Sequence, residues 1–514
     1  MVQQFLNQIE NSDFPASLPG HYIAGEWMLS KTPTSESKSL CPSTGLELAT
    51  SSADKHDIKN AINCAFEYHL GSESSDFKDR ITQIAAFAKV FKEHAPLIIK
   101  TGMREQGKPF WEMSHAINVT LEYLEWVATS GDFINAQLLG PARLGHLSGS
   151  FKQKPAGVVA AYLPFSTTIS TFGFYYVAAL LSNCPVVMFS SKHNLLQSTL
   201  LSCLVEKTSP KAGAFQMVLA GFSDFKLALS DRRVSAVLYT GSRDHCDEIR
   251  EDSSSFPERR LILQSGGKNT AIIDQSADMQ LAVNSIFQGA FRSGGQLCSA
   301  TNRVIVHRSR FDDFKKLCRD AIKKMQIGPT HMPDMNPFMG PLFSEKAVER
   351  FLRFQTMAAR EAEESISWGK AYRPDDESAS RGNFVTPGIH VISRIEDTSY
   401  QKSVILCPDI AVYKFDNLAS GIKEIVNHTH ASFAVSFFGK KSIFDQHADS
   451  MQASNILHNL PTTEVEACLP LAGRYASGFH RFHGPSLAHY LLHPTTCQTR
   501  DQVENKINRW PVLI

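Results

Sequence analysis

The chain contains the stretch Gly294-Gly295-Gln296-Leu297-Cys298-Ser299-Ala300-Thr301-Asn302-Arg303, in which a cysteine follows two glycines and precedes small and polar residues. A second stretch with paired glycines, Gln264-Ser265-Gly266-Gly267-Lys268-Asn269, lies upstream of it. A cysteine acts as a nucleophile through its thiolate, but an isolated cysteine is also common as a small, inert core residue. Cys298 is therefore a candidate nucleophile, and a buried inert thiol is the alternative.

Short apolar, β-branched runs surround these stretches and alternate with segments of helical length. The runs are residues 158–163, 186–189, 234–239, 261–263, 271–273 and 304–307. This alternation predicts parallel α/β sheets. Nearer the N-terminus, apolar residues recur at helical spacing in residues 58–66 and 81–91, which predicts two amphipathic surface helices. The polar segment 373–381 is predicted to be a surface loop.

The composition is that of a globular protein with more than one domain. The chain has 514 residues, of which 43% are hydrophobic and 20% are charged. Its 52 Lys and Arg balance 51 Asp and Glu, so no overall charge attracts it to nucleic acid or to an anionic membrane. The 10 cysteines are isolated from one another, without the paired spacing of metal or redox sites. We expect no metal site and, because residues 1–26 lack the pattern of a signal peptide, a cytoplasmic location.

One segment imitates a membrane span. No charged residue occurs between Leu163 and Ser191, and residues 172–189 are mostly apolar. Ser182-Asn183-Cys184-Pro185 interrupts this run and leaves a helix-length piece followed by a short strand. That pattern predicts a buried helix leading into a parallel strand, and no contact with a membrane.

Further short motifs follow one another along nearly the whole chain. They are His21-Tyr22-Ile23-Ala24-Gly25-Glu26-Trp27, Gln106-Gly107-Lys108-Pro109, Pro155-Ala156-Gly157-Val158-Val159, Tyr239-Thr240-Gly241-Ser242 and Pro470-Leu471-Ala472-Gly473. Together with the Gln264 and Cys298 stretches, and in this order, they resemble the landmarks of the aldehyde dehydrogenase superfamily. Thr386-Pro387-Gly388-Ile389, Ala476-Ser477-Gly478-Phe479-His480 and Pro485-Ser486-Leu487-Ala488 are most similar to the succinylglutamate semialdehyde dehydrogenases of arginine catabolism.

The resemblance implies an α/β fold of the aldehyde dehydrogenase type. Residues 1–133 and 154–260 are expected to form a Rossmann-like cofactor domain, and residues 261–440 an α/β catalytic domain. Residues 134–153, as a hairpin, and 475–505 are expected to form a β oligomerisation arm, with residues 441–474 returning to the cofactor domain. A homo-oligomer, dimer or tetramer, is therefore expected.

The resemblance also assigns roles in a reaction. Cys298 is expected to attack an aldehyde, a hydride is transferred to NAD or NADP, and water then hydrolyses the thioester. The family's general base is a Glu, at whose position this chain has Gln264, an amide that takes up no proton near neutral pH. The family's oxyanion-binding Asn is replaced by Ser166, which either serves as a shorter donor or only bonds to the backbone.

The expected cofactor contacts are altered in a similar way. Gly241 and Ser242 match the turn that meets the pyrophosphate, in a functional or a purely structural role, while Cys246 occupies the place of its second glycine and is expected to hinder close approach or shorten the helix. Phe189 and Val404 replace a Lys and a Glu that bind the two riboses. Lys192 is either a partner for the 2′-phosphate of NADP or a solvated loop residue.

Three functions are consistent with these residues. The first is an oxidoreductase that converts a semialdehyde of the succinylglutamate type through a Cys298 thioester with NAD or NADP, with impaired turnover. The second is a catalytically silent homologue that acts as a binding or assembly partner. The third is acyl transfer from Cys298 to a thiol.

Overall fold

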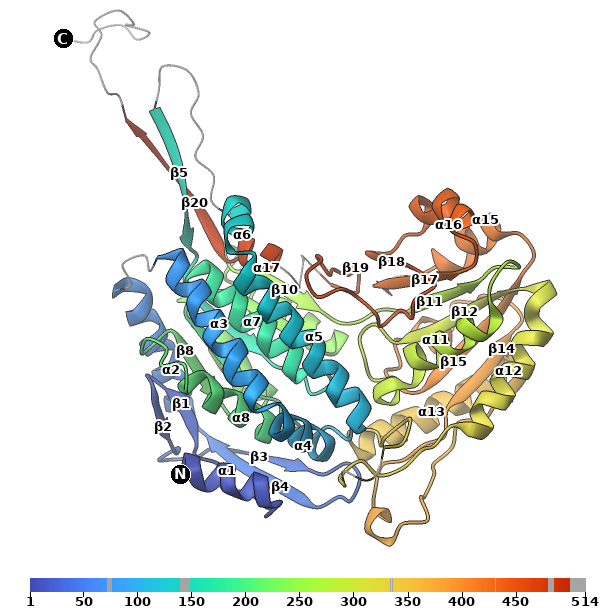
Figure 1. Ribbon diagram of the computed structural model, residues 1–514, viewed down its shortest axis with the longest axis horizontal. Coiled ribbons are helices and arrows are strands. Elements are labelled where there is room, and N and C mark those ends of the chain that lie inside the picture. Colours follow the sequence, from blue (N-terminus) through green and yellow to red (C-terminus); the bar gives the residue numbers. More distant parts are fainter. Residues whose placement is uncertain are drawn as a thin grey trace, which may run out of the picture.

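The computed structural model describes residues 1–71, 76–138, 148–332, 334, 336–429, 431–478 and 485–499. Among these residues, two large sheets lie side by side and a narrow two-stranded arm projects away from the first of them (Figure 1). The predicted α/β fold with parallel-dominant sheets is confirmed.

The first sheet has the strand order β10-β9-β6-β7-β8-β1-β2. Its members are β1 (His21–Ile23), β2 (Glu26–Met28), β6 (Val158–Tyr162), β7 (Val186–Phe189), β8 (Phe215–Val218), β9 (Val234–Thr240) and β10 (Arg260–Gln264). Strands β6 to β10 pair in parallel, and β1 and β2 extend the edge in antiparallel fashion. Because β6 and β7 are buried along their whole length, they are continuous apolar runs in the sequence.

Helices cover both faces of this sheet. One face packs on α3 (Phe77–Glu93), α4 (Ala95–Glu105), α5 (Phe110–Thr129), α7 (Thr168–Ser182) and α8 (Leu195–Glu206), and the other on α2 (Lys55–Gly71), α9 (Phe222–Leu229) and α10 (Arg243–Asp252). Successive strand residues enter opposite cores, as Val159 and Val158 do. The predicted amphipathic helices are α2 and α3. The membrane-like segment forms α7 and β7, and in the described part of the chain no helix is long and apolar enough to cross a membrane.

The second sheet has the strand order β13-β14-β15-β12-β11-β17-β18 and is parallel except for β13. Its members are β11 (Asn269–Ile273), β12 (Thr301–His307), β13 (Ala362–Ser367), β14 (Gly388–Ile392), β15 (Asp409–Phe415), β17 (Ala434–Phe438) and β18 (Asn455–His458). Helices α11 (Met279–Phe291) and α12 (Phe311–Lys324) pack on one face, and α13 (Glu345–Glu361) on the other. The predicted surface loop, 373–381, contains only one short helical turn.

The arm consists of β5 (Ser148–Pro155) and β20 (Leu492–Thr499), which pair in antiparallel fashion over their full length. Residues 134–138, expected in a hairpin, belong instead to α6 (Gly131–Leu138), which corrects that prediction. Residues 139–147, 479–484 and 500–505 of the predicted arm lie outside the described residues. A short helix, α17 (Pro485–His489), leads into β20.

Two of the expected domain limits differ from the sheets. β10 extends the first sheet to Gln264, beyond the expected limit at 260. β18 pairs with β17, so residues 455–458 add to the second sheet and do not return to the first domain. The remaining elements are α1 (Val2–Asn11), β3 (Ser35–Leu40), β4 (Glu47–Ala53), α14 (Ser399–Lys402), α15 (Leu418–Gly421), β16 (Ala431–Ser432), α16 (Lys441–His447) and β19 (Arg474–Tyr475).

Candidate active site

The Cys298 loop connects α11 to β12 through a tight turn. Ser293, Gly294 and Gly295 have φ values of 54°, 59° and 67°, three successive residues in the left-handed region. A Cβ on Gly295 would lie 2.4 Å from the carbonyl oxygen of Cys407, so the turn needs a glycine there. This turn leads the chain away from the end of α11 and places Cys298 against the stretch that begins at Gln264.

The stretch that follows β10 wraps around Cys298. The Gly267 N–H donates to the carbonyl oxygen of Cys298 at 3.1 Å, and the Asn269 Nδ2 donates to the same oxygen at 3.0 Å. At Gly266 the backbone comes so close that a Cβ would lie 3.1 Å from the Cα of Cys298. The two glycine-containing stretches of the sequence are therefore in direct contact, and one fixes the backbone of the other.

Gln264 and Cys298 meet through their side chains. The Gln264 Nε2 donates to the Cys298 Sγ at 3.4 Å, and Gln264 is only 2% exposed. Burial raises the pKa of the Cys298 thiol to about 11, so the thiol is protonated at neutral pH. Gln264 Oε1 is buried and has no partner among the described residues. It is free to orient a water or a substrate oxygen, but as an amide it accepts no proton.

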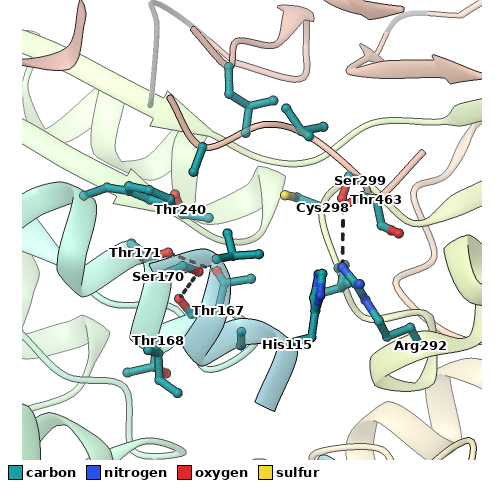
Figure 2. A pocket seen from close by; sticks show the side chains of 18 of the residues that line it. His115, Thr167, Thr168, Ser170, Thr171, Thr240, Arg292, Cys298, Ser299 and Thr463 are labelled. Atoms are coloured by element: carbon teal, nitrogen blue, oxygen red, sulfur yellow. Dashed lines mark hydrogen bonds between the residues drawn. The ribbon is translucent and has the colours of Figure 1, made fainter. Parts of the chain in front are cut away.

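A cavity of about 140 Å³ opens beside this pair and is lined from both domains. Figure 2 shows the Cys298 sulfur directed into the space that Thr240 and the hydroxyl-bearing residues of α7 face from the first domain. Polar lining residues include His115, Thr167, Ser170, Thr171, Thr240, Arg292 and Thr463, and the apolar ones include Phe174, Leu297, Phe433 and Val465. Apolar walls with a few polar groups are typical of a small-molecule site.

Arg292 and His115 lie together on the lower side of the cavity in Figure 2. The Arg292 Nη2 makes one long bond, 3.5 Å, to the carbonyl oxygen of Thr463, and within the described residues its buried Nε has no partner. Burial and the Arg292 charge lower the pKa of His115, so His115 is neutral at pH 7. The cavity therefore offers a guanidinium with unused donors, which suits an anionic group.

The predicted oxyanion residue, Ser166, lies in the turn between β6 and α7. It is not among the residues that line the cavity, whereas its neighbour Thr167 is. The carbonyl oxygen of Ser166 accepts a bond of 2.5 Å from Lys108 Nζ, and the Thr167 Oγ1 lies 3.0 Å from the Thr171 Oγ1. The role of Ser166 stays a prediction, and Thr167 is the hydroxyl of this turn that faces the cavity.

Gly241 and Ser242 stand where a dinucleotide diphosphate is expected, after β9 and at the start of α10. The Gly241 N–H donates to the carbonyl oxygen of Gln264 at 3.0 Å, and the Ser242 side chain caps α10 by accepting from the His245 N–H. Cys246 is 1% exposed and faces the core, while α10 continues to Asp252. The helix is therefore not shortened by Cys246.

The positions expected to bind the two riboses are apolar. Phe189 is fully buried, with its ring 5.3 Å from that of Phe225, and Val404 is half-buried. Lys192 is exposed, which matches a solvated loop residue and leaves its ammonium accessible. Near the N-termini of α9 and α10, the rings of Phe222 and His245 stack with their centroids 3.6 Å apart.

These residues match the expected dinucleotide contacts only in part. The N-terminus of α10, with Gly241 and Ser242, is the position where a diphosphate would bind. Phe189 and Val404 offer no hydrogen bond to a ribose hydroxyl, so two of the expected polar contacts are missing.

The sequence matches the aldehyde dehydrogenase family over residues 27–497. The chain belongs to the aldehyde dehydrogenase family. Among its relatives are the N-succinylglutamate 5-semialdehyde dehydrogenases of Pseudomonas fluorescens (strain Pf0-1), 27% identical with 92% of this chain and 95% of the relative covered, and of Yersinia pestis bv. Antiqua (strain Angola), 25% identical with 93% of each covered.

Solved aldehyde dehydrogenases share the fold. A betaine aldehyde dehydrogenase variant from Staphylococcus aureus, in complex with NAD⁺, has a TM-score of 0.88 at 22% identity, covering 98% of this chain and 100% of the other. Gamma-glutamyl-gamma-aminobutyraldehyde dehydrogenase from Burkholderia cenocepacia J2315 has a TM-score of 0.87 at 21% identity, covering 96% and 99%. Family membership and fold, as predicted from the motifs, are confirmed.

The predicted site residues are only partly brought together. Cys298 and Gln264 touch, and Gly241 joins them through the backbone of Gln264, whereas Lys192 stands apart on an exposed loop. Sequence reasoning missed Arg292 and His115. Arg292 immediately precedes the turn that leads to Cys298, which was an available signal, but nothing in the sequence near His115 marks it.

Proposed function

We propose that this protein captures a carboxylate-bearing semialdehyde of the succinylglutamate type on Cys298 and oxidises it with NAD or NADP at an impaired rate. The observation that carries this proposal is the unused Arg292 guanidinium in the same cavity as a cysteine whose partner is an amide. Two relatives are named for N-succinylglutamate 5-semialdehyde, a substrate with carboxylates.

Arg292 provides the specificity in this proposal. A guanidinium forms paired, charge-assisted hydrogen bonds with a carboxylate, and these strengthen when water is excluded. In the described part of the chain, the Arg292 guanidinium makes one long bond, to the Thr463 carbonyl, and its buried Nε has no partner. His115 is neutral and adds a ring nitrogen beside Arg292, so the positive charge at this side of the cavity comes from the guanidinium.

The chemistry begins at the thiol. The Cys298 Sγ adds to the aldehyde carbon and the thiol proton passes to the aldehyde oxygen, which gives a hemithioacetal. Backbone N–H groups of the Cys298 loop and the Thr167 hydroxyl are the donors available to that oxygen. Gly241 and Ser242 would hold the diphosphate of NAD⁺ or NADP⁺, which would supply the hydride acceptor when bound.

Hydrolysis of the resulting thioester is the weak step. Water must lose a proton as it attacks the acyl carbon, and Gln264 takes up none. Loss of general-base catalysis slows such a step by roughly 100-fold to 10,000-fold. We therefore propose that the acyl group remains on Cys298 for longer than a turnover of an enzyme with a carboxylate base.

The same geometry favours a second candidate, acyl transfer to a thiol. A thiol ionises far more readily than water and needs no strong base, so Gln264 is a smaller handicap for this acceptor. The buried Phe189 favours a third, the silent homologue, because it removes a cofactor contact. Product analysis with and without an added thiol, and titration with NAD⁺ and NADP⁺, separate these candidates.

The substrate class is tested by protecting Cys298 from iodoacetamide with aldehydes, followed by peptide mass analysis. N-succinylglutamate 5-semialdehyde should protect at lower concentration than butanal, and Arg292→Gln should remove most of the difference. Arg308→Gln is the matched control, since Arg308 is exposed and paired with Asp416 on the second domain. Equal protection by both aldehydes in the unmodified protein would refute the anionic specificity.

A further inference from the structure

A buried ion pair, whose two residues also line the cavity, connects two of the loops that face it. Lys108 Nζ is 3.3 Å from Glu112 Oε1, and the two side chains are 7% and 3% exposed. Lys108 lies just before α5 and Glu112 in its first turn. Burying two charges this deeply costs free energy unless each charge is paired and its remaining hydrogen-bonding capacity is satisfied by other groups.

Lys108 holds the first loop. Its ammonium donates to the carbonyl oxygen of Ser166 at 2.5 Å. Ser166 belongs to the turn between β6 and α7, and the next residue, Thr167, lines the cavity. The position of this turn, and with it the Thr167 hydroxyl, is therefore tied to Lys108.

Glu112 holds the second loop. The Ser293 N–H donates to Glu112 Oε2 at 3.0 Å, and the Ser293 hydroxyl donates to Oε1. Ser293 is the only non-glycine residue of the left-handed turn that leads to Cys298, with φ at 54°. A residue with a Cβ is unfavourable in that conformation, so the two bonds from Glu112 offset a backbone strain.

We propose that the Lys108–Glu112 pair is a positioning device that joins the Ser166 turn of the first domain to the Cys298 loop of the second and keeps the thiol directed into the cavity. Its consequence for turnover rests on the proposed function, but the direction of the thiol does not. Both residues line the cavity, and the positioning role proposed for them acts through their hydrogen bonds with Ser166 and Ser293.

The test measures the rate at which iodoacetamide alkylates Cys298, read by peptide mass analysis, in folded protein without aldehyde or cofactor. Glu112→Leu should lower the rate by about tenfold. Without its bonds to Glu112, Ser293 should leave the left-handed conformation, and the cost of that conformation for a residue with a Cβ corresponds to a factor of about ten in the conformational equilibrium. Ser293→Gly alone should stay near the rate of the unmodified protein. In the double variant Ser293→Gly should restore most of the loss, since glycine adopts this conformation without support.

Glu105→Leu is the matched control. Glu105 is also buried, and it accepts from the Ser39 hydroxyl and the Leu196 and Gln197 N–H groups, away from the Cys298 loop. It should leave the alkylation rate unchanged even if it lowers thermal stability. An unchanged or faster rate in Glu112→Leu, or no recovery in the double variant, would overturn the proposal.

If Glu112→Leu does not fold, the alkylation rates of Ser293→Ala and Ser293→Gly are compared instead. Alanine loses the hydroxyl bond and keeps the strain, so it should react more slowly than glycine; equal rates, or a slower glycine variant, would overturn the proposal. Because no aldehyde is present, failure of the proposed substrate class leaves this result unaffected.

Discussion

At the scale of single residues, the contact between Cys298 and Gln264 determines the chemistry proposed for the cavity. The sequence alone identified both residues, because each is flanked by glycines in a recognisable motif. The distance of 3.4 Å between Gln264 Nε2 and Cys298 Sγ and the raised pKa of the thiol are known only from the folded structure, because residues distant in the chain bury this pair. Arg292 and His115 escaped notice for the same reason: their proximity is a tertiary property.

The reactivity of Cys298 should depend steeply on pH. Burial raises the pKa of this thiol to about 11, so the thiolate fraction below that pH rises with every unit. Alkylation should accelerate about tenfold per pH unit from pH 7 to pH 9, because the thiolate is the nucleophile. Stopped-time alkylation with peptide mass analysis measures this. A plateau near neutral pH would indicate an activated thiolate and contradict the assigned environment.

At the scale of elements, the strands and helices of the first sheet followed from local patterns. The continuous apolar runs became β6, β7 and β9 because a parallel sheet covered on both faces needs no polar side. Local patterns predict the arm less well, because β5 pairs with β20, a strand far away in the sequence and near the C-terminus. Likewise, the pairing of β18 with β17 is non-local, and the expectation that residues 455–458 return to the first domain was wrong, whereas Ala467 of the same segment does pack in that domain's core.

We propose that the loop before β15, which carries Val404, limits the affinity for the cofactor. Val404 is half-buried and offers no partner to a ribose hydroxyl, whereas Phe189 is part of the core and less suitable for substitution. Val404→Glu should tighten NAD⁺ binding by roughly threefold to tenfold, the worth of about one hydrogen bond. Calorimetric titration measures this, with Val404→Leu as the apolar control. Micromolar binding by the unmodified protein, unchanged by the substitution, would show that Val404 is not at the ribose.

At the scale of the whole molecule, we propose from the projecting arm that the protein self-associates. Among the described residues, no further strand pairs with either edge of this two-stranded ribbon, and such a ribbon is only marginally stable alone. We expect a dimer or tetramer in which the arm is covered. Light scattering should give a multiple of the 57.0 kDa chain mass. A monomer at micromolar concentration would contradict this, and a chain ending at Leu491, without β20, should lose the association.

The central claim is that Cys298 can be acylated while Gln264 fails to release the acyl group. Intact-mass spectrometry after mixing the protein with N-succinylglutamate 5-semialdehyde and saturating NAD⁺ or NADP⁺ tests it most directly. We expect an acyl adduct that accumulates in the unmodified protein, is absent in Cys298→Ala and is released as free acid in Gln264→Glu. Steady formation of acid by the unmodified protein without an adduct, or the failure of both proteins to form any adduct, would contradict it.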